Sequence, residues 1–415
     1  MSALRSPFMK EFAARGHLHQ CTAEAELDAL MAKERVTGYI GFDCTAPSLH
    51  IGNLTQIMRL RILQRNGHKP IVVVGGGTTK VGDPSGKDES RQLLTDAAIE
   101  ANKQRHMEIY RRFLKFGDGS ADAIMVDNAE WLDKLGYIPF LRDVGKHFTI
   151  NRMLTFDSVK LRLEREQPLT FLEFNYMILQ AYDFLELNRR FGCRLQMGGS
   201  DQWGNIVNGI DLTRRVDAVE LYGLTTPLIT TADGGKMGKT ASGAVWLHED
   251  SLPAYDYWQF WRNTDDRDVG RFLRLFTDLS LDEIARLEAL EGAEINEAKK
   301  ILATEATTWL HGAAAAQAAA DTARRTFEQG DSAEGLPSAS VPRERLAQGY
   351  PLLDAFLAVQ LITSKSEGRR HMSANALKVN NEVVSADRAL TPADLADGVI
   401  KLSVGKKKHA LLKVQ

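Results

Sequence analysis

The sequence of 415 residues has only three cysteines, Cys21, Cys44 and Cys193, and none of them forms a C-x-x-C pair. This odd, unpaired set argues against a disulfide scaffold or a zinc site and fits a reducing cytosol. No signal-peptide pattern opens the chain, and no apolar run approaches the roughly 20 residues that a membrane span needs. We therefore expect a cytoplasmic protein with no membrane segment and no protein-bound metal.

The chain also has no excess of charge of one sign. It contains 52 Lys and Arg against 54 Asp and Glu, which gives a formal net charge of -2. A balanced charge gives no global signature of nucleic-acid binding, so any such contact must come from a local patch. The length and the hydrophobic fraction of 44% are typical of a globular protein with two or three domains.

Two common phosphate-binding motifs are missing. The glycine-rich stretch over 75–87 contains no G-x-G-x-x-G, and residues 233–240 would form a Walker A loop only if Asp233 were glycine. These absences argue against a dehydrogenase and against a P-loop kinase.

The N-terminal part predicts a parallel sheet. Helices are expected over 8–16 and 22–33, strands over 35–42 and 70–74, and a helix over 53–66 between the strands. Strand, helix and strand within about 40 residues make a βαβ unit, which pairs its strands in parallel.

The stretch over 39–53 links the first strand to its helix and is the one around which the chain is organised. It turns at Pro47 and brings His50, Gly52 and Asn53 to the start of the helix, where backbone N–H groups and the helix dipole favour an anion. The glycines over 75–77 and 82–87 follow the second strand. They suit either a close approach to a ligand at the sheet edge or a tight turn.

Residues 92–190 are predicted to be largely helical, and one helix over 171–185 carries a polar face. Tyr176, Gln180 and Asp183 share that face, which is either solvated or lines a small polar pocket. Residues 193–205 predict a short strand, a glycine-rich turn and a helix start. The turn offers Gln196, Asp201 and Gln202 as binding groups, or a simple helix cap.

The next stretch predicts a strand over 225–231 and then a glycine-rich loop with Lys236 and Lys239. Two lysines three residues apart can reach a polyphosphate, although such a loop can also be a solvated hairpin. Residues 278–327 are predicted to be helical, and the Gly-, Ser- and Pro-rich stretch over 329–351 indicates a linker.

The last 65 or so residues predict a small module of two helices and several strands. Its basic residues make a patch suited to backbone phosphates, or else a solvated basic surface. The residues of this patch are Lys365, Arg369, Arg370, Lys378, Lys406, Lys407 and Lys408.

Several of these segments together resemble a known family. His50-Ile-Gly-Asn53 and Lys236-Met-Gly-Lys-Thr240 resemble the two signatures of class I aminoacyl-tRNA synthetases, His-Ile-Gly-His and Lys-Met-Ser-Lys-Ser. Tyr39-Ile-Gly-Phe-Asp43, Gly82-Asp-Pro-Ser-Gly-Lys87, Tyr176-Met-Ile-Leu-Gln-Ala-Tyr-Asp183 and Gly198-Gly-Ser-Asp-Gln-Trp-Gly-Asn205 extend the likeness. The whole chain is similar to the bacterial tyrosyl-tRNA synthetases, and its tail to a small RNA-binding domain first named from a ribosomal protein.

The resemblance implies a two-step reaction. Tyrosine attacks the α-phosphorus of ATP to give tyrosyl-adenylate and pyrophosphate, and the tyrosyl group then passes to the 3′ end of tRNA(Tyr). The resemblance implies that tyrosine is bound by Tyr39, Asp83, Tyr176, Gln180, Asp183, Gln196 and Gln202. It assigns ATP to Asp43, Thr45, His50, Gly52, Asn53, Asp201, Lys236 and Lys239. The catalytic residues it implies are Thr45, His50, Asn53, Lys87, Arg91, Lys236, Lys239 and Thr240, with Mg²⁺ on the departing pyrophosphate.

The chain departs from the family pattern at two places. Asn53 replaces the second His of the first signature, and Gly238 and Thr240 replace the two Ser of the second. The amide of Asn53 can still donate to a phosphate but carries no charge. The glycine leaves the second loop to act through its lysines and backbone.

Two other functions remain open on the sequence alone. One is a tryptophanyl-tRNA synthetase, against which Asp183 and the Tyr39 segment favour a phenol. The other is an RNA-binding protein derived from a synthetase that has lost catalysis, which would need broken signatures. A homodimer is expected by resemblance, with residues 131–157 as the candidate interface.

The expected fold class is α/β: a Rossmann-like catalytic domain with a parallel sheet, an α-helical domain and a small α+β RNA-binding domain. The expected boundaries are 1–225 for the catalytic domain with its inserted dimer segment, 226–328 for the signature loop and helical domain, 329–350 for the linker, and 351–415 for the RNA-binding domain.

Overall fold

The computed structural model describes residues 4–85, 94–235, 237–240, 243–326, 336–396, 398–405 and 408–415. The chain divides into two compact units. The first comprises Met1–Lys239, Ala244–Ser251 and Asp265–Ala298, and the second Thr240–Gly243, Leu252–Thr264 and Lys299–Gln415. The four-part division expected from the sequence stays a prediction. Within the described ranges, no helix is long and apolar enough to cross a membrane.

The first unit is built on a six-stranded sheet in the order β1-β6-β5-β2-β3-β4. The strands are β1 (Gln20–Cys21), β2 (Thr37–Phe42), β3 (Lys69–Val74), β4 (Ile124–Asp127), β5 (Cys193–Gly199) and β6 (Tyr222–Thr226). All neighbours pair in parallel except β1, which runs antiparallel to β6. The parallel sheet predicted from the first βαβ unit is therefore confirmed.

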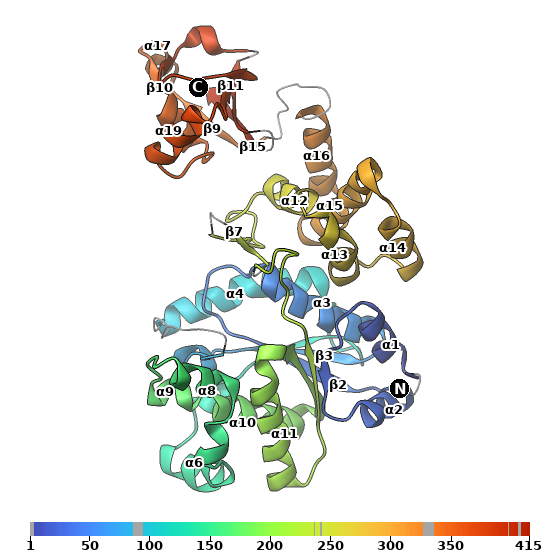
Figure 1. Ribbon diagram of the computed structural model, residues 1–415. Helices are drawn as coiled ribbons and strands as arrows, with labels where there is room; N and C mark the ends of the chain where they lie inside the picture. The colour runs from blue at the N-terminus through green and yellow to red at the C-terminus, as the bar shows by residue number, and fades with distance from the viewer. Residues whose placement is uncertain are drawn as a thin grey trace. The chain divides into compact units, whose positions relative to one another are not determined.

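The strand order reverses between β2 and β5. From β2 the chain proceeds to β3 and β4 on one side, and from β5 it proceeds to β6 on the other. Because parallel crossovers are right-handed, α3 (Ile51–Arg65) and α11 (Trp203–Asp217) cover opposite faces of the sheet (Figure 1). In open α/β sheets the crevice at such a reversal is where ligands bind.

The first part of this unit carries helices on both sides of the sheet. They are α1 (Pro7–Ala14), α2 (Glu24–Lys33), α4 (Asp96–Phe113), α5 (Ala129–Leu132), α6 (Tyr137–Asp143), α7 (Ile150–Met153), α8 (Asp157–Glu164), α9 (Phe171–Phe174) and α10 (Tyr176–Phe191). Helices α10 and α11 lie side by side against β5 (Figure 1). Gly192 ends α10 in the left-handed conformation that glycine adopts without strain.

Residues 92–190 are largely helical, as expected, but they also contain β4, which extends the parallel sheet beside β3. One expectation for this unit was wrong. The strand expected over 225–231 ends at Thr226, since Pro227 has no N–H to donate to a sheet ladder.

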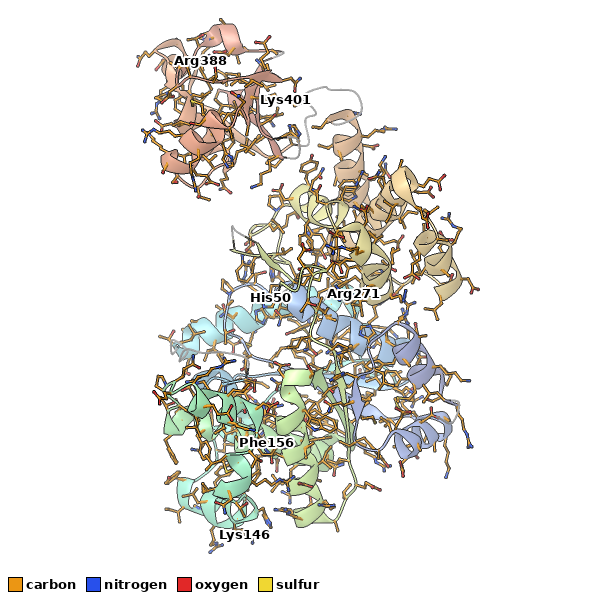
Figure 2. All side chains as sticks on the ribbon, viewed as in Figure 1. His50, Lys146, Phe156, Arg271, Arg388 and Lys401 are labelled. Carbon is orange, nitrogen blue, oxygen red and sulfur yellow. The ribbon has the colours of Figure 1, made fainter. Side chains whose placement is uncertain are left out.

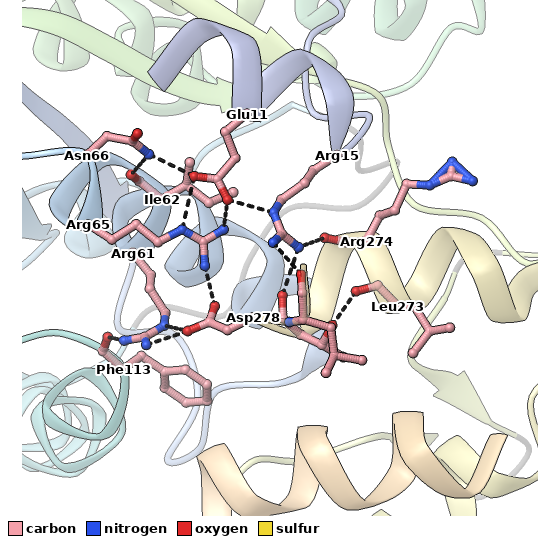
Figure 3. Close-up of polar contacts among 12 residues, drawn as sticks. Glu11, Arg15, Arg61, Ile62, Arg65, Asn66, Phe113, Leu273, Arg274 and Asp278 are labelled. Carbon is pink, nitrogen blue, oxygen red and sulfur yellow. Dashed lines mark hydrogen bonds and ion pairs between the residues drawn. The ribbon is translucent and has the colours of Figure 1, made fainter. Parts of the chain in front are cut away.

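A network of ion pairs ties α1 and α3 to Asp278, in the segment that follows α13 (Val269–Phe276) (Figure 3). Arg65 on α3 pairs with both Glu11 and Asp278, and Arg61 Nε donates to Asp278 Oδ2 at 2.9 Å. These ion pairs hold α1 and the segment after α13 against α3.

The helical character expected over 278–327 is confirmed by α14 (Leu281–Glu288), α15 (Ile295–His311) and α16 (Ala313–Arg324). Helix α12 (Ala254–Arg262) precedes this range. In the second unit α12 packs on α16, and Trp258 and Trp261 of α12 are buried. The short strands β7 (Lys239–Thr240) and β8 (Gly243–Ala244) form a separate two-stranded sheet.

The C-terminal part of the second unit forms a module with its own apolar core. Its main sheet has the order β12-β11-β14-β15-β9, and β10 (Tyr350–Pro351) pairs with β13 (Ala389–Leu390). The main strands are β9 (Ser338–Val341), β11 (Leu377–Val379), β12 (Glu382–Val383), β14 (Val399–Val404) and β15 (Lys408–Val414). The helices are α17 (Arg343–Ala347), α18 (Leu352–Ala358) and α19 (Lys365–Ser373).

The module begins earlier than the sequence suggests. Residues 338–347 fall in the stretch expected to be a linker, yet they form β9 and α17. Strand β9 pairs in parallel with β15, and Leu346 is fully buried in the module core. The polar composition of the stretch favoured a linker, but its two buried side chains Val341 and Leu346 attach it to the apolar core of the module. Residues 329–335 of the expected linker lie outside the described residues.

Candidate active site

A cavity of about 510 Å³ lies at the carboxyl ends of β2 and β5, where the strand order reverses. All seven residues expected to bind tyrosine line it: Tyr39, Asp83, Tyr176, Gln180, Asp183, Gln196 and Gln202. Six of the residues expected to bind ATP line it as well: Asp43, Thr45, His50, Gly52, Asn53 and Asp201. Segments far apart in sequence thus meet in one cavity, and the polar face of α10 belongs to a pocket and is not solvated.

The floor of the cavity is formed by Tyr39 on β2 and Asp183 on α10, both buried. The Tyr39 hydroxyl and Gln196 Oε1 have no hydrogen-bond partner among the described residues. Buried polar atoms are almost always paired, so these two atoms indicate a polar ligand at this end of the cavity.

Burial raises the pKa of Asp183 to about 7, against the lowering effect of two hydrogen bonds to its carboxylate. Trp131 Nε1 donates to Oδ1 at 2.7 Å, and Asn128 Nδ2 donates to Oδ2 at 2.9 Å. Burial, helped by the nearby Asp183 carboxylate, raises the pKa of Tyr39 well above its usual value. The site therefore holds a carboxylate that changes its protonation state close to neutral pH.

Asn128 and Trp131 both hydrogen-bond to Asp183, and the sequence reasoning assigned neither of them to the site. Asn128 directly follows β4, and its Oδ1 accepts from the Gly77 N–H at 2.8 Å while its Nδ2 also reaches Thr78 Oγ1 at 3.0 Å. The one signal that could have revealed it was the strand over 124–127. Once that strand is recognised, a polar residue at its carboxyl end is a candidate for the site.

A second polar network lies between α10 and the turn after β5. Gln202 Nε2 donates to Asp83 Oδ2 at 2.8 Å, and Gln180 Nε2 donates to Gln202 Oε1 at 3.3 Å. Asn205 Nδ2 donates to Gln180 Oε1 at 3.0 Å, which fixes the orientation of that amide. The arrangement presents the Asp83 carboxylate and the two amides to one part of the cavity.

Tyr176 connects this network to the residues expected to bind ATP. Its hydroxyl donates to Asp43 Oδ2 at 3.2 Å, and Asp43 Oδ1 accepts from Thr78 Oγ1 at 2.8 Å. Burial and the neighbouring Asp83 raise the pKa of Asp201, which also lines the cavity. The cavity therefore offers several acceptors for a hydroxyl or an ammonium group.

His50, labelled in Figure 2, lies at the start of α3, and Asn53 lies in the first turn of this helix. His50 is the N-cap, and its Nδ1 accepts from the Gly52 N–H at 3.0 Å, while Asn53 Oδ1 accepts from the His50 N–H at 3.0 Å. This reciprocal pair is a capping box, which stabilises the helix start. The capping box explains why an asparagine suits this position of the signature. Its side-chain oxygen accepts the hydrogen bond of the cap, and its side-chain NH₂ group remains available to donate to a ligand.

Gly238, one of the two departures, is required by the backbone. Its φ is +83°, and a Cβ there would lie 2.3 Å from Ile51 Cγ2 at the start of α3. A serine at this position would therefore be strained and would clash with the first turn of α3.

The phosphate-contacting set is only partly described. Lys87, Arg91 and Lys236 lie outside the described residues, and Lys239 and Thr240 are placed only as the backbone of β7. Among the described residues, no group of three or more His, Cys, Asp and Glu side chains could hold a metal ion.

The basic residues of the C-terminal module lie on several of its elements. Arg369 and Arg370 on α19 and Lys408 on β15 are exposed, and Lys378 on β11 is half-buried. Lys365 is exposed at the start of α19, where it pairs with Asp354 at 2.6 Å. Lys406 and Lys407 lie outside the described residues.

The family model of the class I tRNA synthetases (W and Y), the tryptophan and tyrosine enzymes, matches residues 31–328. The match spans most of the chain and includes the whole cavity, so the chain belongs to this enzyme family.

The curated relatives point to one member of the family. A tyrosine–tRNA ligase from Rhodospirillum rubrum is 64% identical and covers 100% of this chain and 99% of its own. The tyrosine–tRNA ligase of Nitrobacter winogradskyi is 59% identical over 100% of both chains. A solved structure of a C-terminally truncated mitochondrial tyrosyl-tRNA synthetase from Aspergillus nidulans superposes with a TM-score of 0.70 at 30% identity, covering 77% of this chain and 94% of that one.

Proposed function

We propose that the chain is a tyrosine–tRNA ligase that uses ATP. A carboxylate oxygen of tyrosine attacks the α-phosphorus of ATP, the bond to the β-phosphate breaks, and pyrophosphate leaves. The 3′-terminal hydroxyl of tRNA(Tyr) then attacks the carbonyl carbon of the adenylate and releases AMP. The observation that carries the proposal is the buried pair of Tyr39 and Asp183, which suits a phenol.

The phenol of the substrate is bound at the floor of the cavity. It donates its proton to Asp183, whose two oxygens are already held by Asn128 and Trp131, and it accepts from the unpaired Tyr39 hydroxyl. A phenylalanine would leave both buried partners unpaired. Tyrosyl-tRNA synthetases are the known example of this effect, and members of that family reject phenylalanine by about 10⁵-fold.

The ammonium group of tyrosine is bound by Asp83, Tyr176 and Gln180. The hydrogen bonds among Asp83, Gln202 and Gln180 hold these acceptors in one arrangement before the substrate arrives. Gln196 and Gln202 border the same pocket. No covalent intermediate with the enzyme is needed, so positioning and charge stabilisation carry the rate enhancement.

ATP lies along the first turn of α3. The N-terminus of a helix favours phosphate, and His50 and Asn53 add an imidazole and an amide to its N–H groups. Asp43, Thr45, Gly52 and Asp201 complete the nucleotide contacts. Lys87, Arg91, Lys236, Lys239 and Thr240 meet the pyrophosphate, and Mg²⁺ enters with the phosphates of ATP as part of the substrate.

The C-terminal module binds the tRNA. Its exposed Arg369, Arg370 and Lys408 suit phosphate oxygens, together with Lys365, Lys378, Lys406 and Lys407 of the same patch. Since its substrates are ATP and tRNA, we place the enzyme in the cytoplasm.

The test of the activity is pyrophosphate exchange with ATP, measured with tyrosine, with tryptophan and without amino acid. Exchange that requires tyrosine supports the proposal. Exchange with tryptophan alone would make the chain a tryptophanyl enzyme, and no exchange with either would make it an inactive RNA-binding relative.

The enzyme is also proposed to be a homodimer. Large apolar side chains are exposed in the segment expected to be the interface, with Tyr137 62% and Ile138 70% exposed. Leu141, Ile150 and Leu154 belong to the same exposed set. Apolar side chains exposed together in this way are typical of an interface.

Sedimentation of the purified enzyme tests the dimer. Ile138→Asp places a charge in the proposed interface and should give monomers, whereas Leu281→Asp, at an exposed leucine of α14, should leave the dimer intact. A wild-type enzyme that sediments as a monomer at micromolar concentration would overturn the proposal.

A further inference from the structure

A second cavity of the first unit adjoins the active-site cavity. Its volume is about 360 Å³, and it is lined from the end of α1, from α3, from the segment after β6 and from α13. Thr55, Arg59 and residues Pro227, Leu228 and Ile229 line both cavities. His17 and Thr226 line only the second one. The two cavities therefore share a wall but have separate deep ends.

The deep end of the second cavity holds three buried polar side chains. His17 is 0% exposed, Arg59 2% and Thr226 1%. Both ring nitrogens of His17, Arg59 Nε and Thr226 Oγ1 have no hydrogen-bond partner among the described residues. Because buried polar atoms cost free energy when they are unpaired, four such atoms around one cavity indicate a polar ligand.

The other arginines around this cavity are already engaged. Arg15 pairs with Glu11 and donates to the carbonyl oxygens of Arg274, Thr277 and Leu279, as Figure 3 shows in part. Arg274 pairs with Glu288, and Arg271 with Asp268. These three cations are therefore balanced by carboxylates of the protein.

Arg59 differs from them. Its Nη1 donates to the neutral amide oxygen Gln56 Oε1 at 2.7 Å, and no ion pair of Arg59 occurs within the described ranges. Burial lowers the pKa of Arg59 to about 9, with the charge of Asp201 acting in the opposite direction. Burial, together with Arg59 and Arg15, also lowers the pKa of His17 well below its usual value, so His17 is neutral and offers one N–H. The deep end thus favours an anion.

Part of the cavity wall is apolar. Leu228, Ile229 and Leu275 line it beside the paired Arg271 and Arg274, and Gly16 and Leu228 are exposed. An inorganic ion would make no use of these apolar walls. A carboxylate group suits the deep end, because a guanidinium matches its two oxygens. A cavity of this size has room for a compact organic molecule.

We propose that this second cavity binds a compact organic carboxylate, with its anionic end on Arg59, His17 and Thr226 and its apolar body along Leu228 and Leu275. Because Arg59 and residues Pro227, Leu228 and Ile229 belong to both walls, its occupancy changes the affinity for ATP. Binding itself is independent of the proposed function, and only this coupling rests on the ATP assignment.

The experiment is a calorimetric titration of the full-length enzyme with benzoate, with saturating tyrosine present so that the amino-acid pocket is occupied. Benzyl alcohol and inorganic phosphate are titrated in parallel. The variants are His17→Phe, which keeps an aromatic ring beside Phe12 but removes both nitrogens, and Thr226→Val, which removes only the hydroxyl. His19→Phe is the control, because His19 lies two residues away and lines neither cavity.

The proposal expects benzoate to bind with one site per chain at millimolar concentration and benzyl alcohol not to bind. Affinity should fall at least about tenfold in Thr226→Val, since the lost hydrogen bond is to a charged group, and binding should be lost in His17→Phe but kept in His19→Phe. Saturating benzoate should change the ATP dissociation constant at least about fivefold, and ATP should change benzoate affinity by the same factor.

Four outcomes would overturn the proposal. They are no benzoate binding at these concentrations, equal binding by His17→Phe, stronger binding of phosphate than of benzoate, and complete displacement of benzoate by ATP. The last would mean that the ligand occupies the nucleotide site. A folded His17→Phe enzyme is identified by unchanged pyrophosphate exchange without benzoate. If the His17→Phe enzyme fails to fold, the Thr226→Val enzyme provides the test. Unchanged benzoate affinity in Thr226→Val would then refute the proposed carboxylate site.

Discussion

Replacing Asp183 by Asn removes the acceptor for the phenol and leaves the shape of the cavity floor nearly unchanged. Asp183 is buried and accepts from Trp131 and Asn128, so in its ionised form it offers the substrate a charged acceptor held in place. A hydrogen bond to a charged group contributes about 1.5–3 kcal/mol, which corresponds to a loss of roughly 10- to 150-fold. We expect this loss in the ratio of kcat/KM for tyrosine to kcat/KM for phenylalanine.

The pH profile gives a second and independent expectation. Burial raises the pKa of Asp183 to about 7, so the carboxylate is ionised above that pH and protonated below it. In the free enzyme, kcat/KM for tyrosine should therefore rise about tenfold between pH 6 and pH 8, and this rise should vanish in Asp183→Asn.

The same shift has a consequence for stability, opposite in sign to that of a carboxyl whose pKa is lowered in the folded state. The folded pKa of about 7 lies above the usual value of 3.8, so the folded state keeps a proton that the unfolded chain releases. The contribution of Asp183 to stability is fully present below pH 3.8 and is lost as the pH rises toward 7, up to ~4 kcal/mol. The thermal midpoint of Asp183→Asn, relative to that of the wild type, should therefore rise from pH 5 to pH 8.

The assays are pyrophosphate exchange with both amino acids from pH 5.5 to 8 and thermal unfolding over the same range. Asp28→Asn is the matched control, because Asp28 is also buried and bonded but lines neither cavity. An Asp183→Asn enzyme with wild-type discrimination and a wild-type pH profile would refute the role given to this carboxylate.

Three further predictions concern other parts of the chain. His50→Ala should slow adenylate formation, measured by stopped flow, with little change in tyrosine affinity, and it should lower stability by about 1 kcal/mol because the helix cap is lost. His50→Asn should restore the stability, measured by melting curves, but not the rate of adenylate formation. Gly238→Ser should lower the exchange rate, and adding Ile51→Ala should recover only the part due to the clash, since the positive φ remains. Deleting residues 327–415 should preserve pyrophosphate exchange and abolish tRNA charging in a filter assay; equal loss of both activities would contradict a separate RNA module.

The structure also changes where that deletion should start. A cut at residue 351, the expected domain start, would leave β9 and α17 without the module they belong to. The truncated enzyme would then end in a strand without its partner β15 and in an exposed Leu346, and both features favour aggregation. The cut before residue 336 avoids both.

Much of the site could be predicted because its motifs are short and local. The cap of α3 needs only His50 and Asn53, which are three residues apart, and the polar face of α10 follows from helical spacing. The parallel sheet followed from one βαβ unit. Two features of the sheet were not predicted. Strand β4 was missed because it is a short strand among helices, and the end of β6 was placed too late because the apolar residues after Pro227 suggested a longer strand.

The sequence by itself determined the order of the signatures, the polar groups they carry and the helices that present them, because these depend on neighbours along the chain. Only the tertiary structure decided which distant residues share an environment. It places Trp131 and Asn128 on Asp183, and His17 and Thr226 around Arg59. Burial also sets the pKa of Asp183 to about 7, and burial is a property of packing that no local pattern contains.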